Sequence, residues 1–268
     1  MFDLKNKVAI VTGASGILAS SIIKSLARSG VHLVLLSRNK ASLRDVEEGI
    51  SKFDTKVLSL ECDILSKDSL MTVKDSILKH FGRIDILLNV AGGNLPGATI
   101  RPDQNVFDMS LDDFNTVVEL NLNGTVLPCM VFAEVMAQQK YGTIVNYSSM
   151  AAQRTITRVA GYSASKAAME NFTKWLAIEM ATKFGEGIRV NAIAPGFFIG
   201  KQNKQLLLNE DGSYTDRGKR IIENTPMGRF GEAEELNGAV HFLCSDASKF
   251  VTGIVLPIDG GFNAFSGV

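Results

Sequence analysis

The chain has 268 residues, 46% of them hydrophobic, and its 28 Lys and Arg residues balance 28 Asp and Glu residues. This composition is typical of a globular protein long enough for one large α/β domain with a sizeable core. The balanced charge and the lack of a basic run argue against a nucleic-acid partner, and no apolar stretch approaches the length expected of a membrane span.

The first residues and the cysteines favour a cytoplasmic protein. Residues 1–5 have neither the apolar core of a signal peptide nor the glycine of a myristoylation site. Cys62, Cys129 and Cys244 are odd in number and far apart, which suits a reducing compartment and shows no metal-ligand spacing. We therefore expect a cytoplasmic location, no membrane partner and no bound metal.

Short apolar runs alternate with helical patterns through the first 90 residues. The expected strands are residues 7–12, 31–36, 56–61 and 84–89, and the expected helices are residues 17–29, 41–53 and 67–81. Strands that alternate with helices of this length imply right-handed βαβ units and a parallel sheet.

The second half continues the alternation after a long connection at residues 92–110. Expected helices are 111–139, 159–184 and 232–245, and expected strands are 142–149, 188–194 and 253–258. The pattern predicts a Rossmann-type doubly wound domain over residues 1–268, with about seven parallel strands flanked by helices on both faces. A polar, irregular stretch predicts a substrate flap around residues 197–229, and Trp175 is expected in the core.

The first strand-to-helix turn is a candidate phosphate site. A glycine turn lets the backbone approach a pyrophosphate, and the helix that follows offers unpaired N–H groups and the positive end of its dipole. The candidate residues of this turn are Gly13, Ser15, Gly16, Ile17 and Leu18.

The end of the second strand carries the residues expected to meet the adenosine ribose. A dinucleotide site usually has an Asp or Glu here, whereas this chain has Ser37, Arg38 and Asn39. An arginine can pair with a 2′-phosphate that an acid would repel. The sequence therefore favours NADP(H), with NAD(H) as the alternative.

Tyr162 and Lys166 stand four residues apart at the start of an expected helix and so share one face. A free phenol has a pKa of about 10 and a free lysine about 10.4. Held together, the lysine charge favours the phenolate, so that Tyr162 can exchange a proton with an alcohol or ketone.

With these residues in place, the chain resembles the short-chain dehydrogenase/reductase family along essentially its whole length. The matching positions are the Thr12-Gly13 turn, Asp63, Asn89-Val90-Ala91-Gly92, Asn121-Leu122-Asn123-Gly124, Ser149, Tyr162 to Lys166, Asn191 and Pro195-Gly196. Ser149 precedes Tyr162 by 13 residues, the spacing of that family. Ser148 is the neighbouring alternative, and it should point to the other face of the strand.

The resemblance implies a role for each matching residue. Tyr162 would be the general acid in reduction and the general base in oxidation, and Lys166 would lower its pKa and hold the nicotinamide ribose. Ser149 would bind the substrate oxygen, and Asn121 would hold a water that relays protons. The remaining positions implied for the cofactor are Asp63, Ile64, Asn89, Ala91, Gly92, Pro195, Gly196 and Phe198.

Two departures from the family pattern concern the cofactor. The usual TGxxxGxG turn has glycines where this chain has Ile17 and Ala19, so we expect a reshaped pyrophosphate turn. A threonine that often follows the Pro-Gly pair is absent, and Gly200 stands close to its position.

Within the family, the chain resembles the branch of D-mannonate oxidoreductases, or fructuronate reductases. The resemblance lies in Ala91 to Pro96, Pro195 to Phe198, Leu207 to Ser213, Thr225 to Gly231 and Asp259 to Phe262. A sugar acid needs a cation for its carboxylate and polar groups for its hydroxyls. The candidate substrate residues are Asn94, Ser149, Gln153, Arg154, Arg158, Gln202 and Asn203.

Other activities remain open from the sequence. Leu206, Leu207 and Leu208 with Phe197 and Phe198 could build an apolar groove for a 3-oxoacyl thioester, and another sugar or polyol dehydrogenase fits the same motifs. A non-catalytic dinucleotide-binding scaffold is the alternative of another class. The resemblance also implies a homotetramer, although the apolar face with Ala160, Ala164, Ala167, Ala168 and Phe172 is equally consistent with internal packing.

Overall fold

The computed structural model describes residues 1–200 and 204–267, and its centre is a parallel sheet. Among the described residues this sheet has seven strands in the order β3-β2-β1-β4-β5-β6-β7. The strands are β1 (Val8–Thr12), β2 (His32–Ser37), β3 (Val57–Glu61), β4 (Ile86–Asn89), β5 (Gly142–Tyr147), β6 (Ile188–Pro195) and β7 (Val255–Ile258). The expected Rossmann-type architecture is confirmed, and the strand order reverses between β1 and β4.

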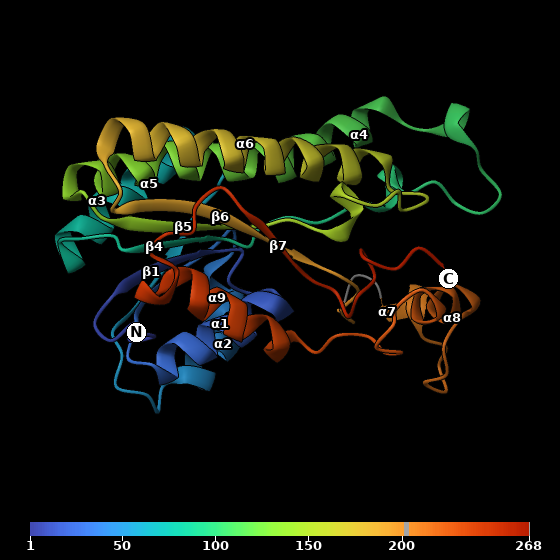
Figure 1. The fold of residues 1–268 in the computed structure, drawn as a ribbon, viewed down its shortest axis with the longest axis horizontal. Coiled ribbons are helices and arrows are strands. Elements are labelled where there is room, and N and C mark those ends of the chain that lie inside the picture. Colours follow the sequence, from blue (N-terminus) through green and yellow to red (C-terminus); the bar gives the residue numbers. More distant parts are fainter. Residues whose placement is uncertain (201–203, 268) are drawn as a thin grey trace.

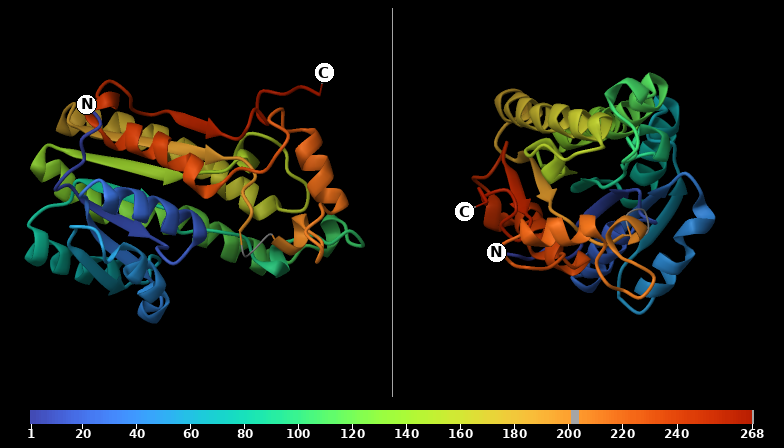
Figure 2. Two further views of the ribbon diagram at one scale, coloured as in Figure 1. Left: turned by 90° about the horizontal axis from the view of Figure 1, so that it is seen from below. Right: turned by 90° about the vertical axis from the view of Figure 1, so that its right-hand side faces the viewer.

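Helices cover both faces of the sheet (Figure 1). They are α1 (Ile17–Arg28), α2 (Arg44–Ile50), α3 (Lys67–Phe81), α4 (Leu111–Val118), α5 (Gly124–Gln139), α6 (Ala160–Phe184), α7 (Lys204–Leu207), α8 (Asp216–Glu223) and α9 (Asn237–Cys244). Helices α1, α2 and α9 lie on one face and α3, α5 and α6 on the other, and both views of Figure 2 show the same layering.

Each face of the sheet has its own apolar core, because the central strands are buried on both sides. One core packs β1 and β2 against α1 and α9 and contains Cys244. The other packs the opposite strand faces against α3, α5 and α6 and contains Cys62 and Cys129. All three cysteines are free and buried.

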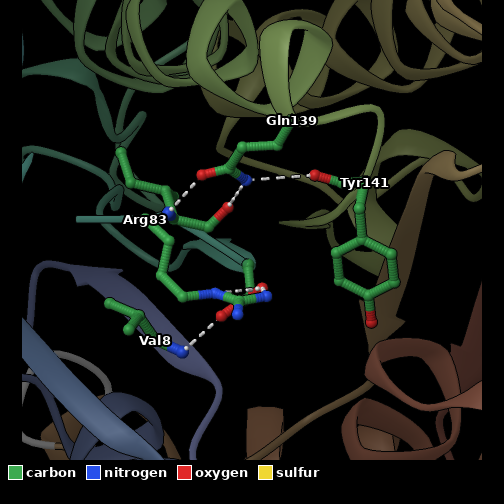
Figure 3. A network of polar contacts seen from close by, with 6 residues as sticks. Val8, Arg83, Gln139 and Tyr141 are labelled. Atoms are coloured by element: carbon green, nitrogen blue, oxygen red, sulfur yellow. Dashed lines mark hydrogen bonds and ion pairs between the residues drawn. The ribbon is translucent and has the colours of Figure 1, made fainter. Parts of the chain in front are cut away.

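A polar cluster around Asp85 ties the amino-terminal ends of β1 and β4 to the end of α5 (Figure 3). Asp85 is completely buried, and its carboxylate accepts a hydrogen bond from Val8 N (2.8 Å) and pairs with Arg83. Gln139 Oε1 accepts a hydrogen bond from Ile84 N, and Gln139 Nε2 donates to the carbonyls of Ile84 and Tyr141. Polar contacts thus hold the amino-terminal ends of the strands, at the opposite end of the sheet from their carboxyl ends.

The expected helix over residues 111–139 is continuous, but one of its turns is π-helical. Helix α4 passes into a π-helical turn at Glu119–Asn123, and α5 follows at once. Contrary to the sequence-based expectation, the segment Leu111–Gln139 is long and apolar enough to span a membrane. Because 61% of its most apolar window is buried and α5 packs against α3 and α6, it is a core helix of this fold.

Two further expectations change in the structure. Trp175 on α6 is 56% exposed, because it lies on the side of the helix opposite the sheet. The expected helices at 41–53 and 232–245 begin as short 3-10 turns before α2 and α9, so the continuous α-helices are shorter than predicted.

The segment between β6 and α9 forms a small unit of its own. Among its described residues, Leu207, Ile221 and Phe230 form an apolar cluster apart from the two sheet cores. Helices α7 and α8 lie beyond the carboxyl end of β7 (Figure 1), on the side of the molecule where the strand ends converge.

Candidate active site

The first strand-to-helix turn is locked against the loop after β4. Thr12 Oγ1 accepts hydrogen bonds from the main-chain nitrogens of Val90 and Ala91, both at 3.1 Å. Gly13 has a φ of 61°, and a Cβ at this position would lie 2.8 Å from Ala91 Cα. A glycine is therefore required, and the two loops meet where the strand order reverses.

The amino terminus of α1 is open to an anion. Gly16 is the N-cap, no side chain caps the helix, and the first turn contains no acidic residue. The first N–H groups of a helix have no partner within it, so they can bind a phosphate. Two residues replace the usual glycines of this turn. Ala19 is fully buried in the core and Ile17 is 40% exposed, so neither side chain blocks the helix terminus.

A cavity lies at the carboxyl ends of β2 and β3, where the adenosine end of a dinucleotide is expected. It is lined by Arg38, Glu61, Cys62, Asp63 and Ser69. The structure thus brings Arg38 and Asp63 together, whereas Ser37 bonds Ser42 Oγ (3.0 Å) and Asn39 caps a 3-10 turn through Ala41 N. Glu61 was missed from the sequence, although its position as the last residue of β3 is a signal for it.

Asn121 lies in the π-helical turn and is completely buried. Its Nδ2 donates to the carbonyls of Gly93 (2.7 Å) and Val117 (2.8 Å), and its Oδ1 accepts from Gly93 N (3.0 Å). The inserted turn therefore fixes the loop after β4. A Cβ at Gly92 would lie 2.7 Å from Asn121 Oδ1 and 3.2 Å from Lys166 Nζ, so this loop, Asn121 and Lys166 converge on one point.

Lys166 is buried, and its Nζ donates to the Tyr147 carbonyl at 2.7 Å. The same Nζ lies 5.7 Å from the centre of the Tyr162 ring. Burial lowers the pKa of Lys166 to about 8, so this ammonium can lose its proton close to neutral pH.

The pKa of Tyr162 differs from the sequence-based expectation. Burial raises it, and the hydrogen bond with Ser149 acts in the opposite direction. Burial is the larger effect, and the Lys166 ammonium donates its hydrogen bond to the Tyr147 carbonyl, not to the phenol. Tyr162 is thus a phenol held in its neutral, proton-donating form.

The structure separates the two neighbouring serines at the end of β5. Ser148 is buried, and its Oγ donates to Glu170 Oε1 at 2.6 Å. Ser149 is partly exposed, begins the 3-10 turn Met150–Ala152, and forms the hydrogen bond with Tyr162. The two serines thus have different partners on α6, and Ser149 is the one that meets Tyr162.

The residues expected to bind the substrate lie in different environments. Asn94 Nδ2 donates to Thr99 Oγ1 (2.6 Å), whereas its buried Oδ1 has no partner among the described residues. Arg158 belongs to the loop directly before α6, near Tyr162. Gln202 and Asn203 lie outside the described residues.

Gln153 and Arg154 are engaged with other parts of the chain. Gln153 Nε2 donates to Glu170 Oε1 (3.2 Å) and its Oε1 accepts from Asn263 Nδ2 (2.9 Å). Arg154 Nε donates to the Asn263 carbonyl at 2.9 Å, so its guanidinium holds the C-terminal tail. Glu170, the buried centre of this network, carries no motif that would single it out in the sequence.

The Pro-Gly pair ends β6 beside the last strand. A Cβ at Gly196 would lie 2.7 Å from Asp259 Cα, so close approach of the two chains requires glycine there. Phe198 is buried in the core, with its ring against Gly231. Ile64, by contrast, packs under the π-helical turn against Gly124.

The described ranges 1–200 and 204–267 contain no group of three or more His, Cys, Asp or Glu side chains placed to hold a metal ion. The site instead combines a glycine turn at a helix terminus with a buried lysine, a tyrosine and a serine. This arrangement can bind a dinucleotide and exchange a proton with a substrate oxygen.

These features define a dinucleotide-dependent oxidoreductase on a doubly wound α/β fold. A family model described as enoyl-(acyl carrier protein) reductase matches residues 13–263. The chain belongs to the short-chain dehydrogenase/reductase family and is an NAD(P)-dependent oxidoreductase of that family. The family resemblance inferred from the sequence is confirmed.

Individual relatives cover nearly the whole chain. An uncharacterized oxidoreductase of Bacillus subtilis, UxuB, is 42% identical over 99% of this chain and 98% of the relative. Gluconate 5-dehydrogenase of Gluconobacter oxydans is 34% identical over 97% and 96%. A crystal structure from Haemophilus influenzae, provisionally assigned as a D-mannonate oxidoreductase and containing NAD, is 42% identical over 99% and 98%, with a TM-score of 0.91.

Proposed function

We propose that this protein transfers hydride between a nicotinamide cofactor and an alcohol or ketone carbon of a sugar acid of the D-fructuronate/D-mannonate type. The observation that carries the chemistry is the contact of the partly exposed Ser149 with Tyr162 beside the buried Lys166. The sugar-acid substrate is supported by the polar loops around this site and by the provisional assignment of the Haemophilus influenzae relative.

The proposed mechanism uses four side chains. The nicotinamide supplies or accepts the hydride when it is bound. Tyr162 donates its phenolic proton to the substrate oxygen in reduction and takes it back in oxidation, and Ser149 donates a hydrogen bond to the same oxygen. Lys166 holds the nicotinamide ribose and replenishes the proton of Tyr162, and Asn121 orders the path to solvent.

The proposed cofactor site runs along the carboxyl edge of the sheet. Gly13, Ser15 and Gly16 with the first turn of α1 would hold the pyrophosphate, which fits the uncapped helix terminus and the close approach of Gly13 to Ala91. Asp63 and Ile64 would meet the adenine, and Asn89, Ala91 and Gly92 the groove between the two ends.

The proposed preference for NADP(H) depends on Arg38, which has no ion pair among the described residues and so can bind a 2′-phosphate. Glu61 and Asp63 in the same cavity favour the unphosphorylated ribose, and the Haemophilus influenzae relative contains NAD. NAD(H) is therefore the alternative. Arg38→Gln should lower kcat/KM with NADPH by about tenfold and leave NADH unchanged, because a charge-assisted pair is lost only with the phosphate.

The deciding experiment is a substrate panel with both reduced cofactors. Fructuronate, tagaturonate, a neutral ketohexose and an acetoacetyl thioester are compared by kcat/KM from the absorbance of the reduced nicotinamide. We expect the highest value for a sugar acid, and loss of at least about 100-fold in Tyr162→Phe. A preference for the thioester would assign the protein to the 3-oxoacyl reductases, and a Tyr162→Phe variant as active as wild type would remove Tyr162 from the mechanism.

We further propose that residues 1–268 act as one cytoplasmic domain in a homotetramer, with the segment 197–229 as its substrate flap. The separate apolar cluster of Leu207, Ile221 and Phe230 supports the flap. An exposed apolar stripe on α6 supports association; its members are Ala160, Ala164, Ala167, Ala168, Trp175 and Ile178.

A further inference from the structure

Three segments meet at the adjacent residues Thr157 and Arg158, directly before α6. The carbonyl of Arg158 accepts a hydrogen bond from Ile100 N (3.0 Å), and its Nε donates to Ile100 O (2.8 Å). From the other side, Arg217 on α8 places Nη1 3.4 Å from Thr157 Oγ1. The connection after β4, the loop before α6 and the segment after β6 are thus joined through two arginines.

The backbone at Arg158 is unfavourable for this residue type. Its φ is 80°, in the left-handed region that glycine and asparagine occupy more readily than arginine. Both hydrogen bonds to Ile100 hold the residue in this conformation, and they leave the two terminal nitrogens of the guanidinium without a partner among the described residues. The strained backbone therefore coincides with a guanidinium whose terminal nitrogens are left available for a ligand.

Arg217, which approaches this loop from α8, is also held in a fixed position by its neighbours. The adjacent Gly218 approaches α7 so closely that a Cβ would lie 2.4 Å from the Leu207 carbonyl. Thr215 caps α8 through Gly218 N (3.1 Å), and Ile221 is buried in the cluster below. These contacts fix the first turn of α8 and with it the base of the Arg217 side chain.

The surroundings of the two guanidinium groups are positive. Within residues 1–200 and 204–267, neither arginine forms an ion pair. Burial and the charge of Arg158 lower the pKa of Arg217. The first turn of α6, which follows Arg158, has no acidic residue and no side-chain cap, so its helix dipole adds to the positive potential.

We propose that Arg158 and Arg217 form the seat of a substrate carboxylate, one guanidinium from the loop before α6 and the other from the flap. That the acid is a sugar acid rests on the proposed function, whereas the seat requires only a carboxylate on the substrate. A carboxylate offers two oxygens to planar donors on both sides and relieves their repulsion. A neutral polyol leaves both cations unpaired, so the pair selects acids over neutral sugars.

The experiment compares two ligands with the same six-carbon skeleton, D-mannonate and D-mannitol. Binding to the complex with reduced cofactor is measured by calorimetry, since neither ligand can be reduced there. We expect wild type to bind D-mannonate at least about tenfold more tightly than D-mannitol. Arg217→Gln should weaken D-mannonate by about ten- to a hundredfold and leave D-mannitol within about twofold, because a charged hydrogen-bond partner is removed.

Matched variants test whether charge and geometry both matter. Arg217→Lys should recover part of the D-mannonate affinity, since it keeps the charge but not the planar fork. Arg158→Lys, on the other side of the seat, also keeps the charge but not the planar fork, so it should retain only part of the D-mannonate affinity. Arg220→Gln, on the exposed side of the same helix, should leave both affinities unchanged, and thermal unfolding verifies that each variant is folded.

The outcomes separate this inference from the proposed function. If wild type does not prefer D-mannonate, or if Arg217→Gln weakens both ligands equally, the carboxylate seat is wrong even where sugar acids are turned over. If the preference is present and is reduced in Arg217→Gln and in Arg158→Lys while no sugar acid is turned over, the seat stands and the proposed reaction fails.

Discussion

At the scale of single residues, the site combines a lysine that loses its proton easily with a tyrosine that keeps its own. Burial lowers the pKa of Lys166 to about 8 and raises that of Tyr162. In reduction the pair must deliver one proton to the substrate oxygen, and a neutral phenol beside a protonated lysine is the form that can do so. The apparent pKa of the reaction then belongs to the coupled pair.

This pair predicts opposite pH profiles for the two directions of the reaction. For reduction, kcat/KM should fall about tenfold per pH unit above about 8, because Lys166 is no longer protonated; for oxidation it should rise until the same pH. Initial rates from pH 6 to 10 measure both profiles. Lys166→Met should lose at least about 100-fold, whereas Lys174→Met, exposed on the same helix, should keep the wild-type profile.

A reductive profile that is flat from pH 6 to 10 would show that the lysine does not take part in proton delivery. The lowered pKa also affects stability. Between about pH 8 and its ordinary value of 10.5, Lys166 binds a proton in the unfolded but not in the folded chain. The free energy of unfolding should therefore rise with pH in this window, and the burial cost is fully present below it.

The residues of the proposed catalytic set were identified from the sequence because their spacing follows secondary structure. Tyr162 and Lys166 are one helical turn apart, and Ser149 follows directly after the end of β5, 13 residues before Tyr162. Arg217 could not be found in this way. It reaches Thr157 across 60 residues of sequence, and this contact depends on how the segment after β6 folds back.

At the scale of elements, the order of strands and helices and most of their boundaries followed from apolar periodicity, whereas the 3-10 starts of α2 and α9 and the π-helical turn did not. The run from Leu111 to Gln139 keeps a helical pattern throughout, and an inserted residue shifts that pattern too little to be recognised. Yet this turn aims Asn121 at the loop after β4. The exposure of Trp175 was also missed, because the amphipathic pattern of α6 does not show which apolar residues face the sheet.

The polar cluster at the amino-terminal end of the sheet yields a prediction for stability. Asp85→Ala leaves Val8 N–H without its acceptor and Arg83 without its counter-ion, so we expect a loss of about 2–4 kcal/mol in the free energy of unfolding. Urea unfolding measures this loss. Turnover per folded molecule should not change, because the cluster is at the opposite end of the sheet from Tyr162.

Asp103→Ala is the matched control, since the ion pair of Asp103 with Arg101 is exposed on both sides. Its effect should stay within about 0.5 kcal/mol. A loss below about 1 kcal/mol in Asp85→Ala would mean that water replaces the buried carboxylate without difficulty.

At the scale of the whole molecule, the apolar stripe on α6 is left uncovered by the residues that the structure describes. Trp175 is 56% and Ile178 65% exposed, and large exposed apolar side chains gathered on one helix are typical of an association site. We expect Trp175→Glu to shift the protein from the proposed tetramer to a smaller species in sedimentation velocity, because a charge would be buried in the proposed interface.

Met71→Glu, an exposed position on α3 away from the stripe, is the control and should leave the assembly unchanged. A wild-type protein that sediments as a monomer would remove the proposed tetramer. A tetramer that persists in Trp175→Glu would place the interface elsewhere on the molecule.

The distribution of the three cysteines makes the chain its own reporter of partial unfolding. Cys244 is the last residue of α9 and faces the core on one side of the sheet, and Cys62 and Cys129 lie in the core on the other side. Burial raises the pKa of Cys129 and of Cys244 to about 12, so almost no thiolate exists in the closed state. An alkylating reagent can therefore react only after the covering helix has moved away. Mapping the labelled cysteine by mass spectrometry would show which helical layer opens first, and at what free energy, without any substitution.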